Sequence, residues 1–230
     1  ALRRQHSPAL CATGMTTAPV RDAILRVCDE NLADDGVAFV SYNALPGWHF
    51  VQPVRDMMLY WTADIADPRE KVKAALALLD GMKGIAENVT SGILNRELDS
   101  LSSAEISYIL HDHLEQTNTP CYLKDFVAHA QRHGLAYLSD VAFAGGNPIN
   151  ITPLMTAHVQ QRAGTDVVRA EQYLDFLRGR RFRESLLVKE SRAACIDRSQ
   201  PLARLDKLHF RLVSKLMKDA APPADMRATW

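Results

Sequence analysis

Apolar residues recur at intervals of three or four positions over most of this 230-residue chain, a spacing that predicts amphipathic helices. The first predicted helix covers residues 19–32, with Thr17 as its N-cap and Pro19 near its first position. A further helix over residues 122–133 ends at Gly134, the residue type that most often closes a helix. Other helices are expected to begin near residues 53, 68, 105, 153 and 166.

Three short segments have the composition of strands instead. Residues 37–42 form an apolar run with β-branched and aromatic side chains, which predicts a buried strand. Residues 135–138 and 181–189 resume strand character later in the chain, whereas residues 1–15 show neither period. The sequence therefore predicts an α+β fold that is mainly helical, with a few short strands.

The overall composition excludes several classes of protein. The 27 basic residues balance 27 acidic ones, so the formal charge is zero and gives no general attraction to nucleic acid or to a membrane surface. With 47% hydrophobic residues, the chain is neither disordered nor collagen-like. Four cysteines without a C-x-x-C pair fit reduced thiols in a cytoplasm, and no apolar run is long enough to span a bilayer.

Residues 31–49, NLADDGVAFVSYNALPGWH, resemble a segment of S-adenosylmethionine-dependent methyltransferases that carry a methyltransferase regulatory domain. Three further segments support the resemblance in family order: residues 54–58, 113–135 and 171–183. The resemblance implies a catalytic sheet of the class I type, whose glycine-rich turn holds the cofactor, and relatives that include protein lysine methyltransferases.

The resemblance also implies how the chain is divided. Residues 1–50 correspond to the C-terminal remnant of the methyltransferase α/β domain, residues 51–165 to a helical linker and the regulatory domain, and residues 166–230 to a helix-strand segment with a frayed tail. No G-x-G sequence occurs in the chain, so we expect no cofactor in this chain and no activity of the chain alone. The expected partner is a methyltransferase catalytic domain or a protein substrate.

A candidate substrate pocket follows the predicted strand 37–42. Tyr42, Asn43, Trp48 and His49 come at or after its carboxyl end, which is the edge where open α/β sheets bind ligands. The alternative is an interdomain turn in which Trp48 is a packing anchor. No pattern in the sequence identifies a catalytic residue.

Two histidines have the spacing of metal ligands. His129 and His133 are four residues apart on a predicted helix, which lets two imidazoles share one metal. No glutamate lies between them as in the H-E-x-x-H pattern, so we expect solvated or capping histidines and no metal.

Two stretches of opposite charge complete the candidates. Residues 97–115 contain only acidic charges, and residues 178–192 are rich in arginine. Arg178, Arg180, Arg181 and Arg183 are candidates for docking a partner, or the two stretches dock on each other. An alternative function is a non-catalytic interaction module; a weaker alternative is a nucleic-acid binder that uses the arginines.

Overall fold

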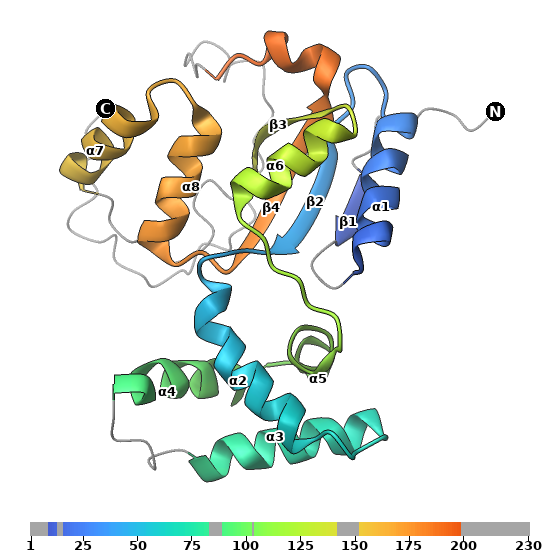
Figure 1. Cartoon of the computed structure of the whole chain (residues 1–230), viewed down its shortest axis with the longest axis vertical. Helices are drawn as coiled ribbons and strands as arrows, with labels where there is room; N and C mark the ends of the chain where they lie inside the picture. Colours follow the sequence, from blue (N-terminus) through green and yellow to red (C-terminus); the bar gives the residue numbers. More distant parts are fainter. Residues whose placement is uncertain (1–8, 13–15, 83–88, 103, 142–151, 199–230) are drawn as a thin grey trace, which may run out of the picture. The chain divides into compact units, whose positions relative to one another are not determined.

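A computed structural model describes residues 9–12, 16–82, 89–102, 104–141 and 152–198 of the chain (Figure 1). All the described elements belong to one compact unit, Ala1–Ile196. None of the helices in the described ranges has the length and apolar character needed to cross a membrane. In chain order the elements are β1 (Ala9–Ala12), α1 (Ala18–Asn31), β2 (Ala38–Asn43), α2 (Trp48–Trp61), α3 (Pro68–Met82), α4 (Val89–Ser102), α5 (Ile106–Tyr108), the π-helix η1 (Ile109–Leu114), α6 (Leu123–Arg132), β3 (Leu135–Asp140), α7 (Pro153–Ala163), α8 (Val167–Arg178), β4 (Phe182–Lys189) and the 3₁₀-helix η2 (Glu190–Cys195). The fold is α+β and mainly helical, as the sequence predicts.

The strands form one sheet in the order β1-β2-β4-β3. β1 and β2 are parallel, and β4 lies antiparallel between β2 and β3. Val40 of β2 is opposite Ser185 of β4. The sheet thus combines strands from the first 50 residues, from the middle and from beyond residue 165, while the divisions near residues 50 and 165 stay a prediction.

The first core lies between this sheet and two helices. Ala38, Val40 and Tyr42 alternate along β2 and therefore point to the same face of the sheet. On that face, buried side chains of α1 and α6 complete one apolar cluster, among them Leu25, Cys28, Phe126, Val127 and Ala130. The sheet thereby holds α1 and α6 side by side in fixed positions.

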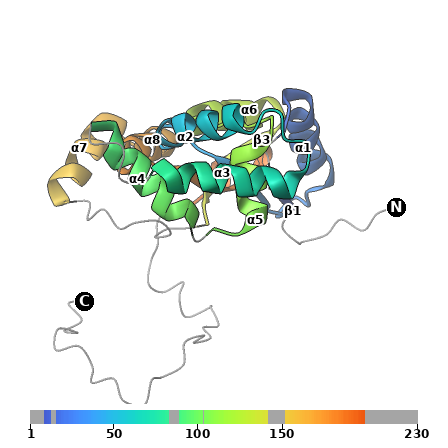
Figure 2. The ribbon, with the colours of Figure 1, turned by 90° about the horizontal axis from the view of Figure 1, so that it is seen from below.

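A second core forms where α2, α3, α4 and η1 pack together. Its buried side chains are Val54, Met58, Val72, Ala75, Leu79, Leu98, Leu101, Ile109 and Leu114. The view from below shows this bundle in front of the sheet (Figure 2). Since the two clusters share no residue, the described part of the unit contains two separate hydrophobic cores.

The structure corrects two predictions on strand and helix ends. Residues 9–12 form strand β1, although residues 1–15 carry no strand period, because β1 is defined by its pairing with β2. Helix α2 begins at Trp48 and keeps Pro53 inside it, where the sequence predicted a start at Pro53. Proline suits a first turn, but here the helix already starts at the buried Trp48, five residues before Pro53.

Two helical features were absent from the sequence prediction. α4 was not predicted. Its Leu98 and Leu101 are buried in the second core, a role that follows from the packing of α4 against the other helices. The expected helix near residue 105 becomes a single turn of α5 followed by π-helix η1. The frayed tail that the sequence predicts at residues 220–225 lies outside the described residues.

Candidate functional site

The loop that follows β2 is held by the residues just before β4. The backbone N–H groups of Ala44 and Gly47 donate to the carbonyl oxygens of Arg181 and Arg180, at 2.8 and 2.9 Å. A Cβ atom on Gly47 would lie 2.1 Å from the carbonyl oxygen of Gly179, so the two segments touch backbone to backbone. This contact fixes the path of the loop.

Asn43 ties the same loop to the helical part. The residue is 3% exposed, and its side-chain amide donates to Asp112 Oδ1 at 3.1 Å and to Asn118 Oδ1 at 3.3 Å. Its carbonyl oxygen accepts from the N–H of Cys121 at 3.1 Å. Burial raises the pKa of Asp112, and the hydrogen bond from Asn43 opposes that shift. Asn43 therefore joins the sheet to two segments of the helical part.

Tyr42 and Trp48 are buried in different surroundings. The ring of Tyr42 stacks on Phe126 with 4.2 Å between centroids, and its hydroxyl lies 3.3 Å from Ser185 Oγ. Trp48 is 2% exposed and faces His113, with 5.9 Å between ring centroids. Both rings fill space within the fold, so their packing agrees with the interdomain-turn alternative.

His113 is the buried titratable group of this junction. It is fully buried, and burial, followed by the positive charges of Arg181 and Arg55, lowers its pKa to about 4. Neither ring nitrogen has a hydrogen-bond partner among the described residues, and the same holds for the indole nitrogen of Trp48. The imidazole is therefore neutral at physiological pH.

His49 is the one exposed member of the four pocket candidates. Its Nε2 lies 3.3 Å from the hydroxyl of Tyr122. The structure thus separates the four residues: Asn43 and Trp48 face the buried junction, Tyr42 lies under the sheet-covering helices, and His49 lies at the surface. They do not converge on one open cavity in the described part of the chain.

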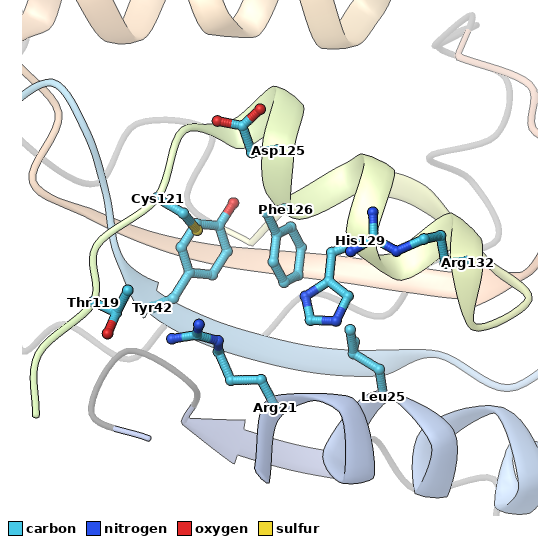
Figure 3. Close-up of a pocket in the computed structure, with 9 residues that line it drawn as sticks. All are labelled: Arg21, Leu25, Tyr42, Thr119, Cys121, Asp125, Phe126, His129 and Arg132. Carbon is cyan, nitrogen blue, oxygen red and sulfur yellow. The ribbon is translucent and has the colours of Figure 1, made fainter. Parts of the chain in front are cut away.

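A pocket of about 170 Å³ opens beside Tyr42, between α1 and α6 (Figure 3). Its apolar floor carries the rings of Tyr42 and Phe126, and its polar groups include Arg21, His129 and Arg132. Burial raises the pKa of the Cys121 thiol to about 12, so this thiol is protonated and a poor nucleophile at neutral pH. The lining residues are Arg21, Leu25, Tyr42, Thr119, Cys121, Asp125, Phe126, His129 and Arg132.

Next to this pocket, an acidic residue of α1 contacts two histidines, one in the last turn of α6 and one at its C-cap. Asp22 Oδ1 lies 2.5 Å from Nε2 of His129 and 3.1 Å from Nε2 of His133. Hydrogen bonds from His129 and then His133 lower the pKa of Asp22. Sequence reasoning found the histidine pair but had no signal for Asp22, which is 107 residues from His129.

The arginine-rich stretch is partly internal. Arg183 is fully buried and makes a two-point ion pair with Asp175, with both N–O distances at 2.8 Å. Its Nη1 lies 2.7 Å from Asp140, which also pairs with Arg180. Burial alone would lower the pKa of Arg183, but the hydrogen bonds and charges of Asp175 and Asp140 outweigh it and raise this pKa.

These contacts correct the docking prediction for two of the four arginines. Arg180 and Arg183 use their guanidinium groups inside the fold and do not offer them to a partner. Arg181 pairs with Glu97, so the basic and acidic stretches do touch at this point, and Arg178 is half-buried on the last turn of α8. Because Arg180 and Arg183 are paired internally, fewer arginine charges remain at the surface for the phosphate contacts that a nucleic-acid binder needs.

Residues 105–189 match the family described as "Predicted methyltransferase regulatory domain". Those residues belong to the methyltransferase regulatory domain family. In this structure the regulatory domain starts one residue before α5 and ends with β4, so it supplies two of the four strands of the sheet. β2, which precedes the regulatory domain, pairs directly with its strand β4.

Curated relatives extend the similarity beyond the regulatory domain. Over 171 residues the chain is 38% identical to the uncharacterized protein RP789 of Rickettsia prowazekii. The matched region covers 73% of this chain and 31% of that protein. Over 201 residues it is 24% identical to the uncharacterized protein sll1526 of Synechocystis, covering 84% of this chain and 38% of that protein. The chain thus spans about a third of the length of these two relatives.

Solved structures show the same relationship. PKMT2 from Rickettsia typhi in complex with AdoHcy is 32% identical with a TM-score of 0.71, over 85% of this chain and 37% of that one. A second structure of the same protein gives 30% identity and a TM-score of 0.72, over 86% of this chain and 38% of that one. The chain is therefore similar in sequence and fold to a part of a methyltransferase.

Proposed function

We propose that this chain is the substrate-selecting portion of an S-adenosylmethionine-dependent methyltransferase, in which the regulatory domain sets the position of the loop after β2. One observation carries the proposal. Residues 43–47, the end of β2 and the loop after it, are hydrogen-bonded to residues 121 and 180–181 of the regulatory domain. Because α/β sheets bind ligands at the carboxyl ends of their parallel strands, a loop at that end of β2 is suitably placed to contact a methyl acceptor.

The cofactor belongs to another part of the enzyme in this proposal. No G-x-G turn occurs in the sequence. β1 and β2 are parallel, as neighbouring strands are in the larger sheets of α/β domains. Among the described strands β1 has a neighbour on one side, so the cofactor-binding strands would add at its other edge. By itself the chain neither binds S-adenosylmethionine nor transfers a methyl group.

Calorimetric titration of the purified, folded chain with S-adenosylmethionine tests the cofactor half of the proposal. We expect no saturable heat. Saturable binding at micromolar affinity would overturn this half, since it would require a cofactor pocket within this chain.

A hybrid enzyme tests the substrate half. It joins the upstream part of Rickettsia typhi PKMT2 to this chain, and transfer of a labelled methyl group to lysine-containing proteins is measured. His49→Ala changes the exposed candidate in the first turn of α2, directly after the loop, while His158→Ala removes another exposed histidine, from α7. We expect His49→Ala alone to raise the KM for the acceptor at least about threefold, without changing the affinity for S-adenosylmethionine. Equal acceptor kinetics in both variants would contradict a role for the loop.

One observation favours the alternative of a protein-interaction module. Tyr60 and Trp61, at the end of α2, are 87% and 61% exposed, and aromatic residues are enriched at binding interfaces. Under this alternative, Tyr60→Ala with Trp61→Ala would abolish binding of the chain to an upstream catalytic domain supplied separately, measured by sedimentation. Unchanged binding would remove the alternative in this form.

A further inference from the structure

Asp22, His129 and His133 bring three potential metal ligands together from two elements. His129 lies in the last turn of α6 and His133 is the C-cap residue of this helix, while the carboxylate comes from the first turns of α1. One ligand atom from each residue lies within 4.8 Å of the other two. Both histidines present Nε2 to the same carboxylate oxygen. The side chains are thus already aimed at a common point.

We propose that these three residues bind a divalent transition metal ion of the zinc class. Two imidazole nitrogens and one carboxylate oxygen are ligands that Zn²⁺ takes readily, whereas Mg²⁺ and Ca²⁺ prefer oxygen atoms alone. Two histidines four residues apart on a helix can bind the same ion, and Asp22 takes the place of a third ligand from another helix.

The geometry needs little adjustment to hold such an ion. Zinc lies about 2.0–2.2 Å from nitrogen and oxygen ligands, so tetrahedral ligand atoms are about 3.3 Å apart. The two contacts from Asp22, at 2.5 and 3.1 Å, fall short of that spacing by less than about 1 Å. The Asp22 side chain is 54% exposed and can move outward by this amount without disturbing the core.

The surroundings leave a coordination position open. The side chains of His129 and His133 are 18% and 21% exposed, so their rings are partly fixed while the ligand atoms remain accessible. His129 also lines the pocket between α1 and α6, where Figure 3 shows its ring pointing toward α1. Three protein ligands with water in the fourth position is the arrangement of an open zinc site. The ion would link α1 to α6 across the face of the sheet.

Zinc titration of the full chain, purified without a polyhistidine tag, tests the site. At pH 7.5 we expect one equivalent of Zn²⁺ to bind with micromolar or tighter affinity and to raise the melting temperature, while Mg²⁺ has no effect. His129→Ala and His133→Ala should each weaken binding at least tenfold, and Asp22→Asn should also weaken it. His158→Ala, an exposed histidine on α7, is the matched control and should bind as the unchanged chain does.

A cobalt spectrum provides a second measurement on the unchanged chain. Co²⁺ in a site with two nitrogen and two oxygen ligands should give a visible absorption band that one equivalent of Zn²⁺ abolishes. Absence of zinc binding in the folded chain, or equal affinity in His129→Ala and His158→Ala, would overturn the proposal. Either result would assign the three residues to a hydrogen-bonded contact between α1 and α6 without a metal.

Discussion

At the scale of single residues, the loop after β2 depends on a close backbone contact. Gly47 has φ −59° and ψ −32°, a conformation open to any residue, so conformational freedom is not what requires glycine here. The requirement comes from space, because a Cβ would lie 2.1 Å from the Gly179 oxygen and 2.4 Å from the carbonyl of Arg180. The contact joins the loop to the regulatory domain directly.

Gly47→Ala should therefore destabilise the chain by about 2 kcal/mol or more, because backbone atoms must shift to admit the methyl group. Gly81→Ala in α3 is the matched control, since nothing lies within 4 Å of a Cβ there. It should leave stability unchanged or raise it by up to about 1 kcal/mol, because alanine is the better helix former. Urea unfolding measures both, and equal effects of the two variants would contradict the close contact.

At the scale of elements, α4 shows how a helix without a clear sequence signal is stabilised by its neighbours. Leu98 and Leu101 are buried against α2, α3 and η1, in a core separate from that of the sheet. Most of the stability of a helix in a protein comes from such packing and not from intrinsic propensity. The bundle should therefore respond to damage to α4 more strongly than the sheet does.

Leu101→Ala should cost about 2–5 kcal/mol, the range for truncating a buried leucine. Leu154→Ala, at a leucine that is 69% exposed on α7, should change stability by less than about 0.5 kcal/mol. Native-state hydrogen exchange should show the larger loss of protection in α2 and α3, and a smaller loss in β2 and β4. Equal loss of protection in bundle and sheet would contradict the division into two cores.

At the scale of the whole molecule, buried His113 couples folding to pH. Its pKa is about 4 in the fold and 6.5 ordinarily, so the unfolded chain binds the proton more tightly. The corresponding stability is fully present above pH 6.5 and is lost as the pH falls toward 4. A shift of this size corresponds to roughly 3 kcal/mol.

His113→Phe should flatten this part of the pH dependence, since phenylalanine keeps an aromatic ring at this position and has no proton to bind. The free energy of unfolding of the unchanged chain should fall between pH 6.5 and 4 by about 3 kcal/mol more than that of the variant. Carboxylates titrate in both proteins and cancel in the difference between them. Parallel curves for the two proteins over this range would show that His113 is not the group responsible.

Much of the fold follows from short-range patterns in the sequence. The strands predicted over residues 37–42, 135–138 and 181–189 correspond to β2, β3 and β4, and helix α6 with its closing glycine was also predicted, because periodicity, composition and capping act within a few residues. The family segments were also recognisable, since they are contiguous stretches of sequence. The candidate site was predicted only in part: the loop after β2 was found, and the buried Trp48 agrees with the alternative of a packing anchor, but the burial of Asn43 was not predicted.

The tertiary structure alone decided which distant residues meet. Asp22 reaches His129 across 107 residues, and the partners of Arg183 come from α8 and β3. β1 and α4 likewise have weak local signals and are fixed by pairing and packing. The sequence by itself determined the local elements and the family, because those depend on neighbouring residues. It left open the charged clusters and the pocket, because contacts between distant segments exist only once the chain has folded.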